Sequence, residues 1–324
     1  MKAIQIHQYG GPEVLRLEKV PSKNPGPTEA RVILKMIGVN FLDIYYRKGI
    51  YREGVTLPFI DGWEGAGIVE EVGTDVINVK PGDRVAYADQ PSSYAEENIV
   101  EADRLIPLPK EFSFVQGAAF PLQGMTAHYL LHEFRKVKPG VVILIHAAAG
   151  GMGQLLVQWA RHLGALVIGT VSTEEKEKAA YAAGAHHVIN YTKQNFASET
   201  MRITSGHGAD LILDGVGKTT FTNNLEAGAV HGYIVMYGSA SGSPDPIDLS
   251  LLTPKAFSIV APSLWKYIQT REELLFRSDA VTHGILEGWL QLKIDRVLPL
   301  AKAAESHRIL ENRQNIGKIL LTTE

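Results

Sequence analysis

The chain of 324 residues contains no cysteine. Disulfide bonds, thiolate metal ligands and a cysteine nucleophile are therefore all excluded, and neither a small disulfide-bonded secreted scaffold nor a zinc finger is indicated. Because nothing in this composition points to an oxidising compartment, we expect a cytoplasmic protein.

Long apolar runs and an excess of charge of one sign are also missing. No segment has the roughly 18 uninterrupted apolar residues of a membrane-spanning helix, and Met1–His7 alternates like a strand and has no apolar signal core. The 32 Lys and Arg residues are balanced by 35 Asp and Glu residues, which gives a net charge of −3. We therefore expect neither a membrane nor a nucleic acid as a partner.

The most informative segment is 143–153, which passes from an apolar strand through a glycine-rich turn into an amphipathic helix. Gly150, Gly151 and Gly153 lack the Cβ that would keep phosphates away from the backbone N–H groups at a helix start. Apolar residues then recur with helical spacing over 154–163. This order predicts a site for the pyrophosphate of a dinucleotide.

A second predicted strand, Ala165–Val171, ends where NAD-binding proteins usually place an acidic residue. Ser172 and Thr173 stand there instead, and Lys176 follows. Hydroxyls and a cation suit the 2′-phosphate of NADPH, whereas a carboxylate would repel it. The two glutamates after Thr173 are a contrary signal, although they open the next helix, where carboxylates favour the helix dipole. The sequence therefore favours NADPH over NADH.

The pattern along the chain predicts an α/β protein of two domains. Residues 1–124 are rich in short strands and tight turns, which is typical of a partly closed barrel. Residues 125–266 alternate strand and helix, as in a doubly wound parallel sheet. Residues 267–324 begin with a helix over 271–292, and we expect this tail to return to the first domain. The predicted strands of the second domain are Val141–His146, Leu166–Val171, His187–Tyr191, Leu211–Asp214, Tyr233–Tyr237 and Ser258–Ala261.

Four motifs carry a resemblance to a known family. They are Gly38–Asp43, Gly62–Val69, Lys80–Val85 and Ala148–Gly153, with Gln158 and Arg161 beyond the last. Over its whole length the chain resembles the medium-chain dehydrogenase/reductases, and within them the zinc-free NADPH:quinone oxidoreductases related to zeta-crystallin. The resemblance implies a GroES-like catalytic domain formed by residues 1–124 and 267–324, and a Rossmann domain of six strands formed by residues 125–266.

Two positions depart from the zinc alcohol dehydrogenases of the same superfamily, which have a catalytic cysteine in the first motif and a histidine before the glutamate of the second. Asn40 and Trp63 stand there, and neither side chain is a suitable zinc ligand. We therefore expect no metal, and we interpret the neighbouring Glu64 as structural. The histidines without metal-ligand spacing, interpreted as packing or surface residues, are His128, His132, His146, His162, His186 and His187.

Without a Lewis acid, the hydride acceptor must itself be electron-poor. The expected function is NADPH-dependent reduction of quinones, with the acceptor in a cleft between the domains and hydrogen-bond donors at the oxygen where charge develops. The resemblance implies Asn40, Tyr45 and Tyr51 as catalytic residues, and Asp43 as an orienting or structural carboxylate. The residues it assigns to the cofactor are Asn40, Tyr45, Thr126, Gly150, Gly151, Met152, Gly153, Ser172, Lys176, Tyr191 and Arg313. Gly217, Tyr237, Gly238 and Ser239 are added because they lie at or after the carboxyl ends of strands, where ligands of such sheets bind.

Two other functions stay open. An NADPH-dependent reductase of enones or enoyl thioesters on the same scaffold needs a proton at the carbon next to the carbonyl, and Tyr45 is the candidate donor. A non-catalytic, crystallin-like protein that retains NADPH or binds RNA is disfavoured by the acidic charge balance. Relatives also suggest a homodimer through an edge strand near Ser258–Ala261.

Overall fold

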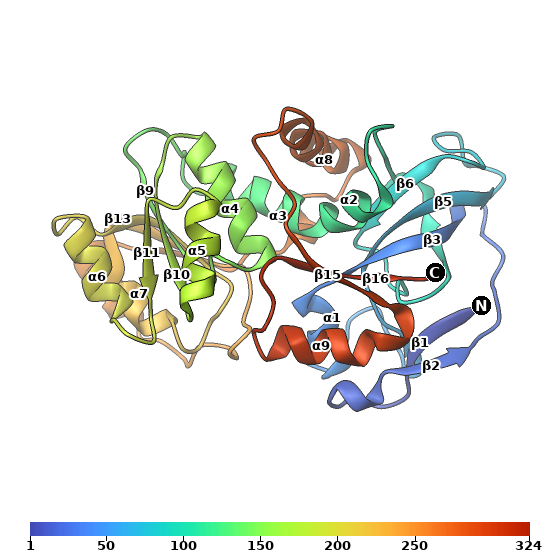
Figure 1. Cartoon of the computed structure of the whole chain (residues 1–324), viewed down its shortest axis with the longest axis horizontal. Helices are drawn as coiled ribbons and strands as arrows, with labels where there is room; N and C mark the ends of the chain where they lie inside the picture. Colours follow the sequence, from blue (N-terminus) through green and yellow to red (C-terminus); the bar gives the residue numbers. More distant parts are fainter. The chain divides into compact units, whose positions relative to one another are not determined.

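The computed structural model describes residues 1–324 and divides the chain into two compact units (Figure 1). Unit 1 consists of Met1–Gln123, Ile268–Thr282 and Ile294–Glu324, and unit 2 consists of Gly124–Tyr267 and His283–Lys293. The expected first domain included all of 267–324, whereas residues 283–293 pack with unit 2. The Trp289 ring stacks on His162 with centroids 4.0 Å apart, and the Gln291 N–H donates to Gln158 Oε1 at 2.8 Å.

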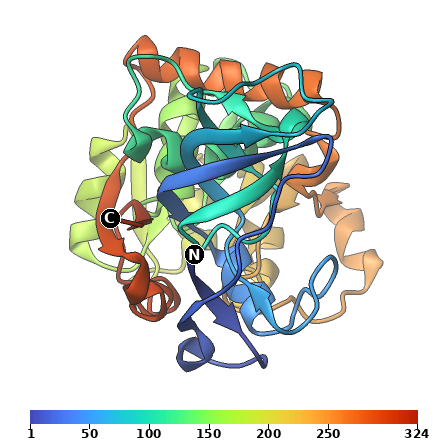
Figure 2. The same ribbon diagram turned by 90° about the vertical axis from the view of Figure 1, so that its right-hand side faces the viewer.

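Unit 1 is built on two antiparallel-rich sheets. A three-stranded sheet has the order β2-β1-β4, and a larger sheet has the order β15-β16-β3-β5-β6-β8, with β7 also paired to β3. Both ends of the chain lie in this unit (Figure 2). Its strands are β1 (Lys2–Ile6), β2 (Arg16–Lys19), β3 (Glu29–Val39), β4 (Phe59–Ile60), β5 (Glu64–Val72), β6 (Arg84–Ala88), β7 (Glu97–Glu101), β8 (Ile106–Pro107), β15 (Ile294–Pro299) and β16 (Lys318–Thr322).

Helices and 3₁₀ turns connect the strands of unit 1. The α-helices are α1 (Phe41–Arg47), α2 (Phe114–Ala119), α9 (Ala303–Glu311), the start of α3 (Pro121–His132) and most of α8 (Arg271–Leu286). The 3₁₀ turns are η1 (Pro12–Val14), η2 (Ala102–Arg104) and η5 (Leu300–Lys302). The helix predicted over 271–292 ends earlier, because Leu290 N–H bonds back to Gly284 O at 3.0 Å and Gly288 adopts φ +83°. Such a left-handed glycine terminates a helix.

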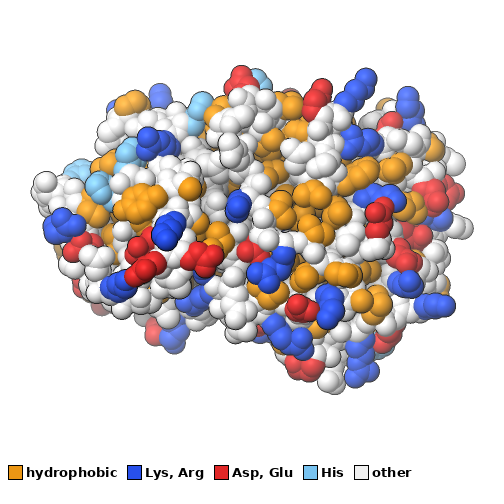
Figure 3. All heavy atoms as spheres, in the orientation of Figure 1, with side chains coloured by type: hydrophobic (Ala, Val, Ile, Leu, Met, Phe, Trp, Pro, Cys, Tyr) orange, Lys and Arg blue, Asp and Glu red, His pale blue; other side chains and the backbone are white.

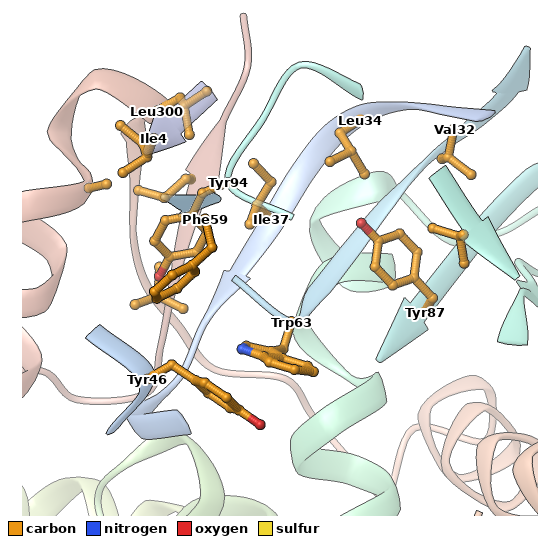
Figure 4. Packing of buried hydrophobic residues seen from close by; sticks show 14 of the residues in the cluster. Ile4, Val32, Leu34, Ile37, Tyr46, Phe59, Trp63, Tyr87, Tyr94 and Leu300 are labelled. Carbon is orange, nitrogen blue, oxygen red and sulfur yellow. The ribbon is translucent and has the colours of Figure 1, made fainter. Parts of the chain in front are cut away.

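The core of unit 1 joins segments that are far apart in the sequence. Ile4 from β1, Ile37 from β3 and Leu300 from the C-terminal tail belong to one buried cluster (Figure 4). The Tyr46 ring lies on the Trp63 indole, with centroids 4.4 Å apart and planes 26° apart. The tail therefore returns to the N-terminal region, as the sequence predicts.

Unit 2 is the predicted doubly wound sheet of six parallel strands, in the order β11-β10-β9-β12-β13-β14. The reversal of order between β9 and β12 creates the point where ligands of such sheets bind. The strands are β9 (Val142–Ile145), β10 (Leu166–Val171), β11 (His187–Asn190), β12 (Ala209–Asp214), β13 (Gly228–Met236) and β14 (Ser258–Val260). The strand expected at Tyr233 begins five residues earlier, at Gly228.

The unit 2 strands consist largely of consecutive apolar residues, because helices cover both faces of a parallel sheet. All four residues of β9 and all six of β12 are buried. In Figure 1, α4 and α5 lie on one face of the sheet and α6 and α7 on the other. The helices and turns are α4 (Gly151–His162), α5 (Glu174–Ala182), α6 (Phe196–Ile203), α7 (Phe221–Ala227), η3 (Leu249–Lys255) and η4 (Leu264–Lys266).

The surface carries charge of both signs, and the helices are not of the membrane-spanning type. On the face in Figure 3, side chains of both charge signs are interspersed. None of the helices combines the length and the apolar composition that crossing a bilayer requires.

The packing of α4 against β9 predicts different effects for two glycines of the turn. A Cβ on Gly153 would clash with Ala147 O and lie 2.7 Å from Ala148 Cα, whereas a Cβ on Gly150 would meet only Ala147 O, at 3.3 Å. We expect Gly153→Ala to destabilise the protein by about 1–3 kcal/mol, because backbone must move to admit the methyl group. Gly150→Ala should cost less than about 1 kcal/mol, from weaker capping alone. Urea unfolding followed by tryptophan fluorescence measures both, and equal losses would contradict this packing.

Candidate active site

Asn40 lies at the junction of β3 and α1. Its backbone is extended, with φ −134° and ψ 157°, and its side chain is 3 % exposed. Asp43, in the first turn of α1, reaches back so that its Oδ2 accepts the Asn40 backbone N–H at 2.8 Å. This return contact satisfies a donor at the start of the helix and holds Asn40 in place.

The Asn40 side chain belongs to a buried triad with Glu64 and Lys318. Lys318 Nζ donates to Asn40 Oδ1 at 2.7 Å and to Glu64 Oε2 at 2.6 Å, and Asn40 Nδ2 donates to Glu64 Oε2 at 2.8 Å. Glu64 Oε1 accepts the Leu122 N–H at 2.7 Å, so both carboxylate oxygens are bonded. A buried ion pair of this kind requires such additional hydrogen bonds to offset its desolvation.

A second buried chain of hydrogen bonds runs from Asp43 to the surface of unit 1. Tyr94 OH donates to Asp43 Oδ2 at 2.8 Å and lies 2.9 Å from His307 Nε2, and Arg47 Nη1 lies 3.0 Å from His307 Nδ1. Arginine can only donate, so His307 Nδ1 accepts and its Nε2–H donates to Tyr94. Arg47 Nη2 also donates to both carboxylate oxygens of Glu311 at 2.9 Å. The donors from Arg47 Nη1 through His307 and Tyr94 therefore point toward Asp43.

Burial is the largest cause of the pKa shifts in and beside this series of hydrogen bonds. It raises the pKa of Asp43 to about 7, although hydrogen bonds from Asn40 N–H and Tyr94 oppose the shift. Burial and the nearby Asp43 raise the pKa of Asp61 well above its ordinary value. Burial, together with the Arg47 charge, holds the pKa of His307 well below its ordinary value, which agrees with a neutral imidazole.

Aromatic residues surround the start of α1. Tyr45, which is 8 % exposed, packs edge-on against Tyr51 with centroids 5.2 Å apart. Tyr51 is 45 % exposed and also packs edge-on against Tyr46, at 5.9 Å. The structure thus brings two of the predicted catalytic residues, Tyr45 and Tyr51, into contact, and the third, Asn40, precedes the helix that carries Tyr45. Their catalytic roles stay predictions.

In unit 2, the N-terminus of α4 has the features of an anion site. Gly150 precedes the helix without a side-chain cap, and the first turn contains no acidic residue. The backbone N–H groups of Gly151, Met152 and Gly153 belong to the first turn, where an α-helix has no carbonyl partner for them. This turn fits the diphosphate of a dinucleotide, because those donors and the helix dipole attract anions.

The region directly after β10 holds hydroxyl side chains before the glutamates of α5 begin. Thr173 Oγ1 accepts the Lys176 N–H at 3.3 Å and so caps α5, while Ser172 and Lys176 are partly exposed. Glu174, the contrary signal in the sequence, pairs with Lys193 at 2.8 Å on the surface, and this contact lowers the pKa of Glu174.

The remaining predicted cofactor residues are distributed over both units. Gly217 adopts φ +92° in a loop tied by Asp214, whose Oδ1 accepts the Gly217 N–H at 3.1 Å. Tyr237, Gly238 and Ser239 directly follow β13, and the other three positions are Thr126 in α3, which is buried, and Tyr191 and Arg313, which are exposed. Binding roles for these residues stay predictions.

Four functional candidates in unit 1 escaped the sequence prediction: Arg47, Tyr94, His307 and Lys318. A signal for Lys318 existed, since it opens a strand whose next three residues are apolar. A lysine at the first position of a short strand, however, usually faces water. Arg47 and His307 are 260 residues apart in the sequence, so no local pattern predicts their contact.

Comparisons with known proteins cover nearly the whole chain. Residues 26–139 match the alcohol dehydrogenase GroES-like domain, and residues 151–276 match the zinc-binding dehydrogenase family. A 2-haloacrylate reductase from Burkholderia sp is 43 % identical over 98 % of both chains, and quinone oxidoreductase 1 from Escherichia coli (strain K12) is 39 % identical over 98 % of both. The solved structure of Escherichia coli quinone oxidoreductase complexed with NADPH superimposes with a TM-score of 0.97 at 38 % identity, covering 99 % of this chain and 100 % of that one.

The chain belongs to the zinc-free quinone oxidoreductase family of medium-chain dehydrogenase/reductases. The predicted architecture, a GroES-like domain with a six-stranded Rossmann sheet, is confirmed, and the protein is an oxidoreductase of this superfamily. Asn40 and Trp63, the two residues that the sequence comparison with zinc alcohol dehydrogenases singled out, both make contacts within unit 1. Asn40 binds the Glu64–Lys318 pair and Trp63 packs on Tyr46.

The raised pKa of Asp43 predicts that the stability of this protein depends on pH. The pKa is about 7 in the folded protein, above its ordinary value of 3.8, so the folded state binds more protons between these values. The stabilisation from protonated Asp43 is therefore complete below about pH 4 and is lost as the pH rises through about 7. Asp43→Asn should remove this contribution, so its Tm should fall less than that of the wild type between pH 4.5 and 7.5. Differential scanning calorimetry at four pH values tests this, and parallel Tm curves for the two proteins would refute it.

Proposed function

We propose that this protein is an NADPH-dependent reductase that transfers hydride to quinones without zinc. The observation that carries the proposal is the end of β10, where Ser172 and the Thr173 cap replace the usual carboxylate and Lys176 stands in the first turn of α5. A cation and hydroxyls there favour a 2′-phosphate over a free ribose hydroxyl. The NADPH complex of the E. coli quinone oxidoreductase supports the same cofactor.

The chain's own groups would hold NADPH at two places in unit 2. The N–H groups of Gly151, Met152 and Gly153 would donate to the diphosphate, and Lys176 and Ser172 would bind the 2′-phosphate. The bound cofactor supplies a hydride from C4 of its nicotinamide ring. The residues therefore contribute binding and orientation, while the difficult chemistry comes from the cofactor.

Residues of unit 1 support the proposal that the acceptor is a quinone. The Asn40 amide is held rigidly, and it carries a second N–H on Nδ2 besides the one given to Glu64. A fixed donor stabilises negative charge that develops on an acceptor oxygen during hydride addition. Tyr45 and Tyr51 add an aromatic wall that suits a planar acceptor such as a quinone. Because Asn40 and Trp63 leave no suitable zinc ligands at these positions, the acceptor must be intrinsically electron-poor.

A second acceptor class is favoured by one comparison. The relative with 43 % identity is a 2-haloacrylate reductase, and a haloacrylate carries a C=C bond conjugated to a carboxylate. Reduction of such a bond needs hydride at one carbon and a proton at the other. An activated alkene is therefore the alternative acceptor on the same site, and Tyr45 is the candidate proton donor.

The proposed assembly is a homodimer. β14 is the edge strand of the unit 2 sheet and its three residues are only partly buried, so it can pair with a second copy. The cytoplasmic location also stays a prediction.

A panel of acceptors tests the proposed function directly. Purified protein should oxidise NADPH with 1,4-benzoquinone or 9,10-phenanthrenequinone at a rate that a chelator such as EDTA leaves unchanged, because no group of the site depends on zinc. The panel includes 2-chloroacrylate and a simple enone. Faster turnover of either than of every quinone would move the assignment to the alkene class. Absence of turnover with all acceptors would overturn the reductase proposal.

Lys176→Ala tests the cofactor assignment. Loss of a charged partner of the 2′-phosphate should raise the KM for NADPH by about tenfold or more, since hydrogen bonds to charged groups contribute about 1.5–3 kcal/mol. The KM for NADH should change less than about twofold. Lys178→Ala, an exposed lysine of the same helix, is the matched control and should leave both constants unchanged. An equal change of the KM for NADPH and for NADH in Lys176→Ala would show that Lys176 does not bind the 2′-phosphate.

A further inference from the structure

Lys318 reaches Asn40 from the far end of the chain through sheet register. β16 runs antiparallel to β3, with Ile319 opposite Val39, so Lys318 lies beside Asn40. Its side chain is 3 % exposed, so the ammonium group must donate its hydrogen bonds to acceptors inside unit 1. The ammonium then contacts Asn40 Oδ1 and Glu64 Oε2, at 2.7 and 2.6 Å.

This contact leaves Asn40 one amide orientation. A lysine ammonium only donates and a carboxylate only accepts, so Oδ1 must face Lys318 and Nδ2 must face Glu64. Reversing the amide would oppose N–H to ammonium and oxygen to carboxylate, which costs both hydrogen bonds and adds repulsion. The second N–H of Asn40 therefore has a defined direction, set by residues that need not touch the substrate.

Gly38 makes room for this arrangement. A Cβ at position 38 would collide with Glu64 Oε2 and lie 2.7 Å from Ala118 O. The carboxylate thus occupies space that any larger residue would take. Together with the Leu122 N–H on Oε1, this confinement leaves Glu64 no alternative position.

Stability alone does not account for the pair. Burying a lysine and a glutamate is costly, and replacing such a pair by apolar residues of similar size is often neutral or stabilising. Its effect on Asn40 is specific, because an amide whose oxygen accepts from an ammonium becomes a stronger N–H donor through cooperative polarisation.

We propose that Lys318, balanced by Glu64, is a positioning residue that orients and polarises the Asn40 side-chain amide so that its second N–H stabilises negative charge on the acceptor oxygen. The inference rests on the proposed function, hydride addition to a conjugated carbonyl acceptor. When hydride adds to carbon, the displaced π-electron pair collects on oxygen, and a proton from water or a protein group completes the product. The Asn40 N–H acts on the charged species between these two events.

The test uses variants that keep the buried charge balanced. Lys318→Met alone leaves Glu64 uncompensated and risks misfolding, so the main variant is the double substitution Lys318→Met with Glu64→Gln. A third variant, Lys318→Arg, keeps a positive charge at position 318 and leaves Glu64 unchanged. The matched control is Arg135→Met with Asp210→Asn, which removes a 3.0 Å ion pair of unit 2. Circular dichroism and Tm establish that each variant is folded.

Two readouts separate positioning from a structural role. In protein labelled with ¹⁵N at asparagine, without cofactor, the side-chain NH₂ signals of Asn40, assigned by their loss in Asn40→Asp, should shift in the double variant and not in the control. With NADPH and a series of substituted benzoquinones, kcat should fall about 10- to 100-fold and the KM for NADPH should stay within about twofold. The loss should grow as the quinone becomes a weaker electron acceptor, and Lys318→Arg should recover part of the activity.

Outcomes that overturn the inference differ from those that overturn the function. An active wild type with a folded double variant of unchanged kcat and unchanged Asn40 signals would overturn the positioning role and leave the reductase assignment intact. A wild type that reduces no acceptor would overturn the proposed function and the charge-stabilising role together. In that case the Asn40 signals still decide whether Lys318 orients the amide, and unchanged signals would reject this as well.

Discussion

Unit 1 depends on the pairing of β16 with β3, because this register joins the end of the chain to the segment that carries Asn40. A shift of one residue would turn Lys318 to the opposite face of the sheet and remove the cation from Asn40 and Glu64. Glu64, at the start of β5, would then remain as a buried carboxylate without its ion-pair partner, which is strongly destabilising. The same buried charges that make the junction specific therefore also enforce the register that creates it.

The helix α1 is held at both ends by buried polar groups. Asp43 ties its first turn to Asn40 and Tyr94, and Arg47 ties its last turn to His307 and Glu311. Because low-dielectric surroundings make unpaired polar groups costly, a network with nearly all its members paired tolerates little movement. Between these anchors α1 carries Tyr45, which packs on Tyr51. Tyr45 and the Asn40 amide are thus fixed by one framework, whereas Tyr51 belongs to the loop that follows α1.

The side chains around Asn40 serve hydrogen bonding and packing. The Asn40 amide contacts the ion pair of Glu64 and Lys318, and the Trp63 indole stacks on Tyr46. In the proposed function, hydride transfer from NADPH needs no metal because the acceptor is itself electron-poor. The glycine turn of unit 2, where we propose that the diphosphate binds, is compatible with many such reactions, because a diphosphate site lies away from the reacting atoms.

The sequence by itself determined the two-domain α/β architecture, the six parallel strands, the glycine-rich turn and the missing acid after Val171, because each depends on local periodicity or on residues close together in the chain. It named Asn40 as a catalytic candidate and Glu64 as structural, and it did not single out Lys318. Only the tertiary structure decided that Lys318, Glu64 and Asn40 meet, and that Arg47 and Tyr94 enclose His307. These contacts join residues separated by as many as 278 positions, and their partners are selected by sheet register and burial, which no short-range pattern encodes.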